Sequence, residues 1–232
     1  VSADSDYVIR STVLGVKNLS IAEIQKHFSY PVYVEYGANA AGFGTVWRSK
    51  ELKDAVYVIV TNNGVAGSII LNNEIYHGRA GRAGAFGHIT LNPSGRKCFC
   101  GACGCWSAYN ALNALTGLDE TDLDGFFEKV NNEDPDAIAK WDEYLTYFAD
   151  GLSTVSMSFD IDIVIGGPLA VYLEPWLDTI ISKMQSRPTL NGENISIHLD
   201  TKSESPMAEG VALMIVAKFL NDELDNFRFD EL

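Results

Sequence analysis

Apolar residues recur along this 232-residue chain with helical and strand periods in turn. Those between Ile138 and Val155 follow one another at three- and four-residue steps, a spacing that predicts a long helix with one face in a core. The stretch "MAEGVALMIVAKFL" (207–220) predicts a second apolar helix, and "DIDIVIGGP" (160–168) predicts a buried strand that runs into a glycine turn. Strands that alternate with helices favour an α/β fold with a mixed sheet.

The first fifty residues carry shorter signals. In "LSIAEIQKHF", Ser20 is followed three residues later by Glu23, a capping-box pattern that predicts the start of a short helix. "PVYVEY" (31–36) alternates β-branched and aromatic residues and predicts a strand. The small residues of "ANAAGFGTVW" (38–47) then favour a helix.

The middle of the chain reads as a hairpin followed by a loop. "AVYVIVTNN" (55–63) predicts a strand, and "AGSIILNNEIYHG" (66–78) predicts a hairpin whose turn is the pair Asn72-Asn73, since asparagine tolerates the left-handed conformation. A glycine-rich loop follows, "GRAGRAGAFGH" (78–88). The spacing of apolar residues from 106 to 115 then predicts one helix, which Gly117 ends.

Composition narrows the class of protein. The formal charge of −14 and the sequence pI near 4.6 make the surface repel phosphates and anionic lipids, so this part of the protein is a poor candidate for gripping nucleic acid itself. No apolar run reaches the roughly 18 residues that a membrane-spanning helix needs. We therefore expect a folded, cytoplasmic protein with no membrane partner.

All four cysteines lie within eight positions. Cys98, Cys100, Cys103 and Cys105 form a C-x-C-x2-C-x-C pattern, and His88 stands ten residues before the first of them. Neighbours this close are awkward disulfide partners, whereas thiolates that converge on one soft cation suit zinc. The candidate ligands are these four sulfurs and the His88 ring. A site closed by four protein ligands would be structural, and the alternative is a set of reduced, metal-free thiols.

Several stretches together identify the chain as resembling the ROK family (repressors, open reading frames, sugar kinases). "GRAGAFGHITLNPSGRKCFCGACGCW" (81–106) resembles the family pattern A-G-E-x-G-H, ten residues, C-x-C-G-x-x-G-C-L-E. "YPVYVEYGANAAGFG" (30–44) is similar to P-V-x-V-E-N-D-A-N-A-A-A-x-G. "VTNNGVAGSIILNNEIYHG" (60–78), "IVIGGP" (163–168) and "MAEGVALMIV" (207–216) look like its second glycine loop with hairpin, its adenosine-side turn and its closing helix.

The resemblance implies an α/β, actin-like (ribonuclease H-like ATPase-type) sugar kinase fold. Residues 1–54 would be part of the N-terminal lobe, and 55–232 the larger C-terminal lobe with a zinc-bound loop and an oligomerisation surface. It also implies that structural Zn²⁺ is held by His88, Cys98, Cys100 and Cys105. Cys103 stands at a variable position of the pattern, so it is either a bystander or a competitor of His88.

The chain departs from the family pattern where the chemistry should be. Phosphorylation of a sugar needs a carboxylate to accept the proton of the attacking hydroxyl, and the position of that aspartate is Gly37 here. Ala85 and Ser107 replace the glutamates that bind sugar in the family, and Asn62-Asn63-Gly64 replaces its phosphate-loop G-T-G. We expect no catalytic residue and no use of ATP.

These substitutions favour the sugar-sensing, or sugar-sensor-derived, effector and oligomerisation domain of a ROK-type transcriptional repressor. Its partners would be a sugar or sugar-derivative effector, further copies of the chain, and DNA only through a domain upstream of residue 1. His88, Asn39 and Gly64 are the residues expected to contact a sugar. The alternatives are a divergent sugar kinase, with Asp54 or Glu35 as the base, and a zinc-stabilised scaffold without a ligand.

The remaining candidates have simpler interpretations. His27 and His77 read as surface or turn residues, and His198 lies in an apparent strand, "NISIHLD" (194–200). Arg79 and Arg82 flank the glycine loop. We expect them to be exposed to solvent, and the alternative is that they contact an anionic ligand such as a sugar phosphate or acid.

Overall fold

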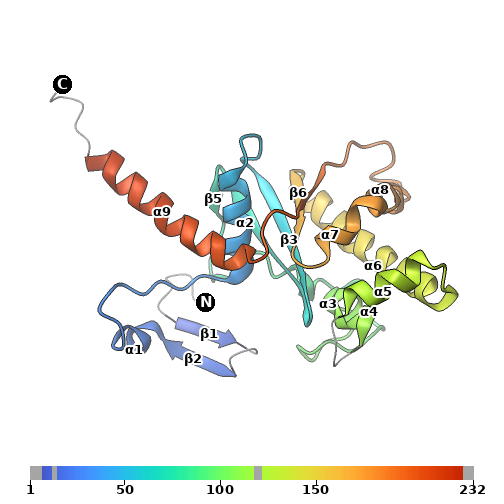
Figure 1. The fold of residues 1–232 in the computed structure, drawn as a ribbon, viewed down its shortest axis with the longest axis horizontal. Coiled ribbons are helices and arrows are strands. Elements are labelled where there is room, and N and C mark those ends of the chain that lie inside the picture. The colour runs from blue at the N-terminus through green and yellow to red at the C-terminus, as the bar shows by residue number, and fades with distance from the viewer. Residues whose placement is uncertain (1–6, 12–14, 118–121, 227–232) are drawn as a thin grey trace.

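A computed structural model describes residues 7–11, 15–117 and 122–226. Strands and helices alternate along most of this length, as Figure 1 shows. The strands are β1 (Tyr7–Ser11), β2 (Val16–Ser20), β3 (Ala55–Thr61), β4 (Gly64–Leu71), β5 (Glu74–Ile75), β6 (Asp162–Gly166) and β7 (Ile197–Asp200). The longer helices are α2 (Gly37–Arg48), α5 (Leu123–Asn131), α6 (Pro135–Phe159), α8 (Leu177–Gln185) and α9 (Pro206–Asn226). The short helices are α1 (Ile21–Gln25), α3 (Ser107–Asn110), α4 (Asn113–Thr116) and α7 (Ala170–Leu173), with 3-10 turns η1 (Phe86–His88) and η2 (Glu174–Trp176).

A mixed five-stranded sheet is the centre of the fold. Its strand order is β5-β4-β3-β6-β7, with β3, β4 and β5 antiparallel and with β6 and β7 parallel to β3. The strands β1 and β2 form a separate two-stranded sheet. The expected mixed sheet of an α/β fold is therefore present.

Both faces of the central sheet are buried, because side chains of β3 alternate between two cores. Val56, Val58 and Val60 face the larger core, which α6 and α8 cover, while Tyr57 and Ile59 face a smaller core under α2. In Figure 1, α2 and α9 accordingly lie on one side of β3 and β6, and α6, α7 and α8 on the other. A strand buried on both faces reads as a continuous apolar run, which is the pattern of residues 55–60.

A buried carboxylate ties the end of β7 to the smaller core. The Asp200 side chain, 2% exposed, accepts a hydrogen bond from Thr45 (2.6 Å) and pairs with Arg48 (3.4 Å), which also reaches Glu209 on α9. Burial raises the pKa of the adjacent Tyr57, and the Asp200 charge adds to this effect. This network joins α2, the sheet and α9.

The predicted long elements are confirmed. The helix around 138–155 is α6, the strand within 160–168 is β6, and the helix within 207–220 lies in α9. Asn72 and Asn73 have φ of 54° and 64°, so the expected left-handed turn joins β4 to β5.

Two local predictions are wrong, one because a partner strand is missing and the other because of a tertiary contact. Residues 31–36 form no strand: no described strand pairs with them, and the Val32 amide donates to the Gln25 side chain instead. The helix predicted for 106–115 breaks into α3 and α4, since the Leu112 amide donates to the carbonyl of Thr61. The short helix predicted to start at Ser20 is confirmed as α1, although the Ser20 side chain makes no capping hydrogen bond.

α9 crosses α2 at close range through glycine. A Cβ on Gly210 would collide with the backbone carbonyl of Ala40, and one on Gly44 would lie 2.9 Å from the Gly210 Cα. Small residues on both helices therefore set the distance between them, and with it the position of the first turn of α9 above the start of α2.

Gly210→Leu should separate the two helices. We expect a loss of about 2–3 kcal/mol in the free energy of unfolding, because the new side chain meets backbone that cannot move aside alone. Urea denaturation measures the change. Ala208→Leu is the matched control, since Ala208 is exposed on the same helix and its replacement should change stability by less than about 0.5 kcal/mol. Equal losses in the two variants would contradict the close crossing.

Candidate functional site

The segment from Ile89 to Cys105 is a loop held largely by its own backbone. Two isolated bridges, Thr90 with Cys105 and Lys97 with Cys103, fold it back on itself. The amide of Gly104 donates to the carbonyl of Arg96, and that of Cys98 to the carbonyl of Ala102. This folding brings the two halves of the cysteine pattern face to face.

Four potential metal ligands converge where the loop meets η1. One ligand atom from each of His88, Cys98, Cys100 and Cys105 lies within 4.8 Å of the others. The sulfurs of Cys100 and Cys105 are 3.7 Å apart, close to the ~3.8 Å that a tetrahedral ion with Zn–S bonds of about 2.3 Å requires. The His88 Nδ1 and the Cys98 sulfur are 3.9 Å apart. Three sulfurs and one imidazole nitrogen fit zinc.

Cys103 lies outside this group, as an exposed residue of the same loop. The sequence allows either four cysteines or His88 with three cysteines as ligands. The structure brings together His88 with three cysteines.

Burial affects the converging thiols unequally. It raises the pKa of the Cys105 thiol to about 12, and hydrogen bonds with Cys100 and Cys98 add to the effect. A backbone hydrogen bond with Ala102 lowers the pKa of Cys100. Because metals bind thiolates, a metal bound here would displace the proton of Cys105, and its affinity would rise with pH.

The loop and the helix that follows are attached to α6 at two places. The Arg96 guanidinium pairs with both oxygens of Glu143 (2.9 and 2.8 Å) and lies 5.0 Å from the centre of the Tyr109 ring. Trp106 is fully buried, and its ring lies where a Cβ on Gly151 would be. These contacts anchor the cysteine loop to the larger core.

Gly37, the first residue of α2, lies beneath a methionine of α9. A Cβ at this position would approach the sulfur of Met207 to 2.7 Å. Tyr36, just before it, is 40% exposed, and burial of part of its ring raises its pKa. An apolar sulfur and an aromatic ring thus surround the position at which the resemblance expects a catalytic carboxylate.

Ser107 is enclosed by the sheet. It is 4% exposed, and its Oγ accepts a hydrogen bond from the Val65 amide at 3.0 Å. A Cβ on Gly64 would lie 2.6 Å from this Oγ, and a Cβ on Gly87 would lie closer still. The lack of side chains at both glycines leaves room for the Ser107 hydroxyl beside β4. Gly64 thus lies beside the cysteine loop, near Phe99, whose ring contacts that of His88.

Glu35 organises the start of α2. Its carboxylate accepts hydrogen bonds from the Tyr36 amide (2.7 Å) and the Asn39 side chain (2.9 Å), and it contacts His77 Nε2 at 2.8 Å. Asn39 is 5% exposed, and its Oδ1 has no partner among the described residues. His77 is predicted to be a surface or turn residue, because nothing in the sequence links it to a carboxylate 42 residues earlier.

Asp54 lies far from these groups. Asp54 directly precedes β3, and its carboxylate accepts a hydrogen bond from the Asn72 amide. Thr61, at the other end of β3, pairs with Gly64 of β4. The six residues of β3 between the two ends span about 20 Å. Asp54 therefore contacts the β4–β5 turn and lies far from Gly64.

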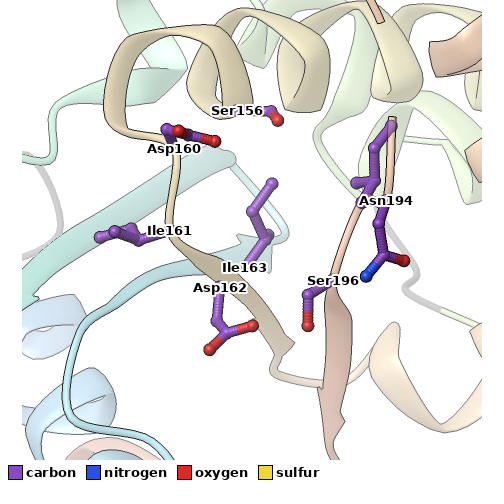
Figure 2. A pocket seen from close by; sticks show the side chains of 8 residues that line it. Ser156, Asp160, Ile161, Asp162, Ile163, Asn194 and Ser196 are labelled. Atoms are coloured by element: carbon purple, nitrogen blue, oxygen red, sulfur yellow. The ribbon is translucent and has the colours of Figure 1, made fainter. Parts of the chain in front are cut away.

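A cavity of about 280 Å³ lies apart from the candidate site, at the starts of β6 and β7. Figure 2 shows its lining, with Asp160 at the end of α6, Asp162 at the start of β6 and Ser196 just before β7. None of the residues expected to bind metal or sugar lines it.

The sequence profile described as "ROK family" matches residues 1–210. The chain belongs to the ROK family. The xylose repressor of Bacillus subtilis (strain 168) is 33% identical over 81 residues, which are 34% of this chain and 21% of the repressor. The chain thus spans about a fifth of the length of that relative.

Two solved ROK structures share the fold. A ROK family glucokinase from Streptomyces griseus, in complex with glucose and AMPPNP, has a TM-score of 0.76 at 24% identity, covering 92% of this chain and 78% of the kinase. A ROK family transcriptional regulator, a homologue of the E. coli MLC protein, has a TM-score of 0.74 at 20% identity, covering 94% of this chain and 63% of the regulator. The expected sugar-kinase-like fold is confirmed, and both repressors and kinases are among the relatives.

Among the helices that the structure describes, none is both long and apolar enough to cross a membrane.

Glu35→Ala tests the organisation of the α2 start. We expect a loss of about 2 kcal/mol in unfolding free energy, because the change leaves the Tyr36 amide and the Asn39 side chain without their acceptor. Urea denaturation provides the measurement, with the exposed Glu51→Ala as control. If Glu35→Ala were no more destabilising than this control, the carboxylate would have no organising role.

Proposed function

We propose that this chain is the sugar-sensing effector and oligomerisation part of a ROK-family transcriptional repressor, and that it does not catalyse phosphorylation. The observation that carries the proposal is the surroundings of Gly37. No side chain is present there to accept a proton from a sugar hydroxyl, and the Met207 sulfur lies where a Cβ would extend. General base catalysis needs a basic group within hydrogen-bond reach of the hydroxyl.

The two other departures from the family pattern support the same interpretation. Ala85 offers no hydrogen-bonding side chain, and the Ser107 hydroxyl is already bonded to β4. The nearby carboxylate, Glu35, is occupied by three partners. A sugar in this site could therefore be bound, but no free carboxylate would be available to accept the proton of its hydroxyl. Binding without reaction suits a sensor better than a kinase.

In this proposal zinc is the structural cofactor and His88, Cys98, Cys100 and Cys105 hold it. Zinc would supply a four-way crosslink between η1 and the loop, and no activated water, because all four positions would be filled by protein. His88 would then serve two purposes, with one ring nitrogen on the metal and the other available to a sugar beside Gly64 and Asn39.

The lobe assignment is part of the proposal. Residues 1–54 would belong to an N-terminal lobe and 55–232 to the C-terminal lobe, in keeping with the separate β1–β2 sheet and with a central sheet that begins at Ala55. The chain would associate with copies of itself and reach DNA only through a domain before residue 1.

Zinc content should depend on Cys105 and not on Cys103. We expect wild-type protein and the Cys103→Ser variant to contain about one zinc per chain. Cys105→Ser should lose the metal and melt at a lower temperature, because such a site contributes on the order of 10 kcal/mol to folding. Elemental analysis and thermal unfolding measure both effects. Metal-free wild-type protein whose melting temperature is insensitive to chelators would contradict the zinc clamp.

Incubation with glucose and ATP should yield no sugar phosphate. The reason is the lack of a base at residue 37, and a coupled assay for ADP release is the measurement. The glucokinase from Streptomyces griseus, assayed in parallel, shows that the assay works. Turnover that Glu35→Gln abolishes would overturn the proposal and favour the divergent kinase.

A further inference from the structure

We propose that the effector of this site is an anionic monosaccharide, a sugar phosphate or a sugar acid, and that Arg79 and Arg82 recognise its charge. The inference rests on the proposed sugar-sensing function and specifies the class of ligand. It rests on the placement of one loop, on the charges of the proposed site, and on the contrast with Arg48, Arg96 and Arg187, which are paired.

Both ends of the glycine-rich loop are fixed at the candidate site. At its start, His77 contacts Glu35, two residues before Gly37. At its end, η1 carries His88 beside the cysteine loop. Gly84, near that end, packs so closely on β4 that a Cβ would meet the Gly67 carbonyl. Residues 78–84 therefore run along the border of the site between position 37 and His88.

Arg79 and Arg82 are the charged residues of this segment, and both are exposed. Neither side chain makes an ion pair or hydrogen bond with a described residue. By contrast, Arg48, Arg96 and Arg187 each pair with a carboxylate. In a chain with 31 acidic and 17 basic residues, partners for a cation are plentiful. Two unpaired guanidinium groups on one seven-residue segment therefore stand out.

The positions that the proposed site is built from carry no free negative charge. Gly37, Ala85 and Ser107 are neutral, and the Glu35 carboxylate is bonded on both oxygens. The amino end of α2, a helix of 12 residues, adds the partial positive charge of its dipole at position 37. A neutral sugar would gain little from this arrangement. A phosphate or carboxylate would gain charge-assisted, bidentate hydrogen bonds from the arginines.

The test compares neutral and anionic sugars by isothermal titration with the zinc-loaded protein. The neutral arm contains glucose, xylose and N-acetylmannosamine; the anionic arm contains glucose 6-phosphate, N-acetylmannosamine 6-phosphate and glucuronate. We expect binding in the anionic arm that weakens as salt is raised, because exposed charges are screened. Phosphate esters and glucuronate distinguish the two sources of charge. Inorganic phosphate is the probe for charge alone.

Arg79→Gln and Arg82→Gln should each weaken binding of the anionic sugar roughly tenfold, and together roughly a hundredfold. Lys53→Gln is the matched control, since Lys53 is an exposed cation at the far end of β3, and it should bind as the wild type does. Circular dichroism of each variant establishes that the fold is intact.

The possible failures are distinguishable. Equal or tighter binding of neutral sugars, unaffected by the arginine variants, would overturn the charge inference and leave sugar sensing intact. Inorganic phosphate that binds as tightly as the sugar phosphates would also overturn it, since no sugar would then be recognised. Absence of binding in both arms would overturn the sugar-sensing function together with this inference, whereas ADP release from ATP would overturn the proposed function alone.

Discussion

The convergence of one imidazole and three thiols is the interaction on which the rest of the site depends. The loop from Ile89 to Cys105 has two isolated bridges and no strand or helix of its own, so side chains have to help its backbone hydrogen bonds to offset the entropy of ordering it. His88, Cys98, Cys100 and Cys105 lie at the two ends and the middle of this path. A metal crosslink at that point, as proposed, would fix η1 and with it the end of the glycine loop.

The attachment of this loop to the core is equally specific. Trp106 follows the last ligand directly and is fully buried against Gly151 of α6. On the opposite face of the sheet, the Asp200 network and the Gly210 crossing place α9 over the first turn of α2. The proposed sugar site would thus lie between these two attachments, with Glu35 and the two loop arginines as its charged groups.

The sequence predicted what depends on periodicity and local turn chemistry. The long helix α6, the buried strands and the Asn72-Asn73 turn all follow from such signals, and the family pattern pointed to the four converging ligands. Contacts between distant residues were not predictable. The break between α3 and α4 arises from a carbonyl on β3, and the pairing of Glu35 with His77 has no signature in spacing. Residues 31–36 show the opposite case, in which a strand-like pattern found no neighbouring strand.

The separation of the crosslink from the neutral walls has an evolutionary consequence. If the loop owes its folding to the histidine and cysteines, an exposed neighbour that is no metal ligand, such as Ala85, can change without unfolding the domain. Ligand preference can then drift over a scaffold that selection holds constant. Such modularity would let one architecture serve both as a catalyst in some lineages and as a silent receptor in others.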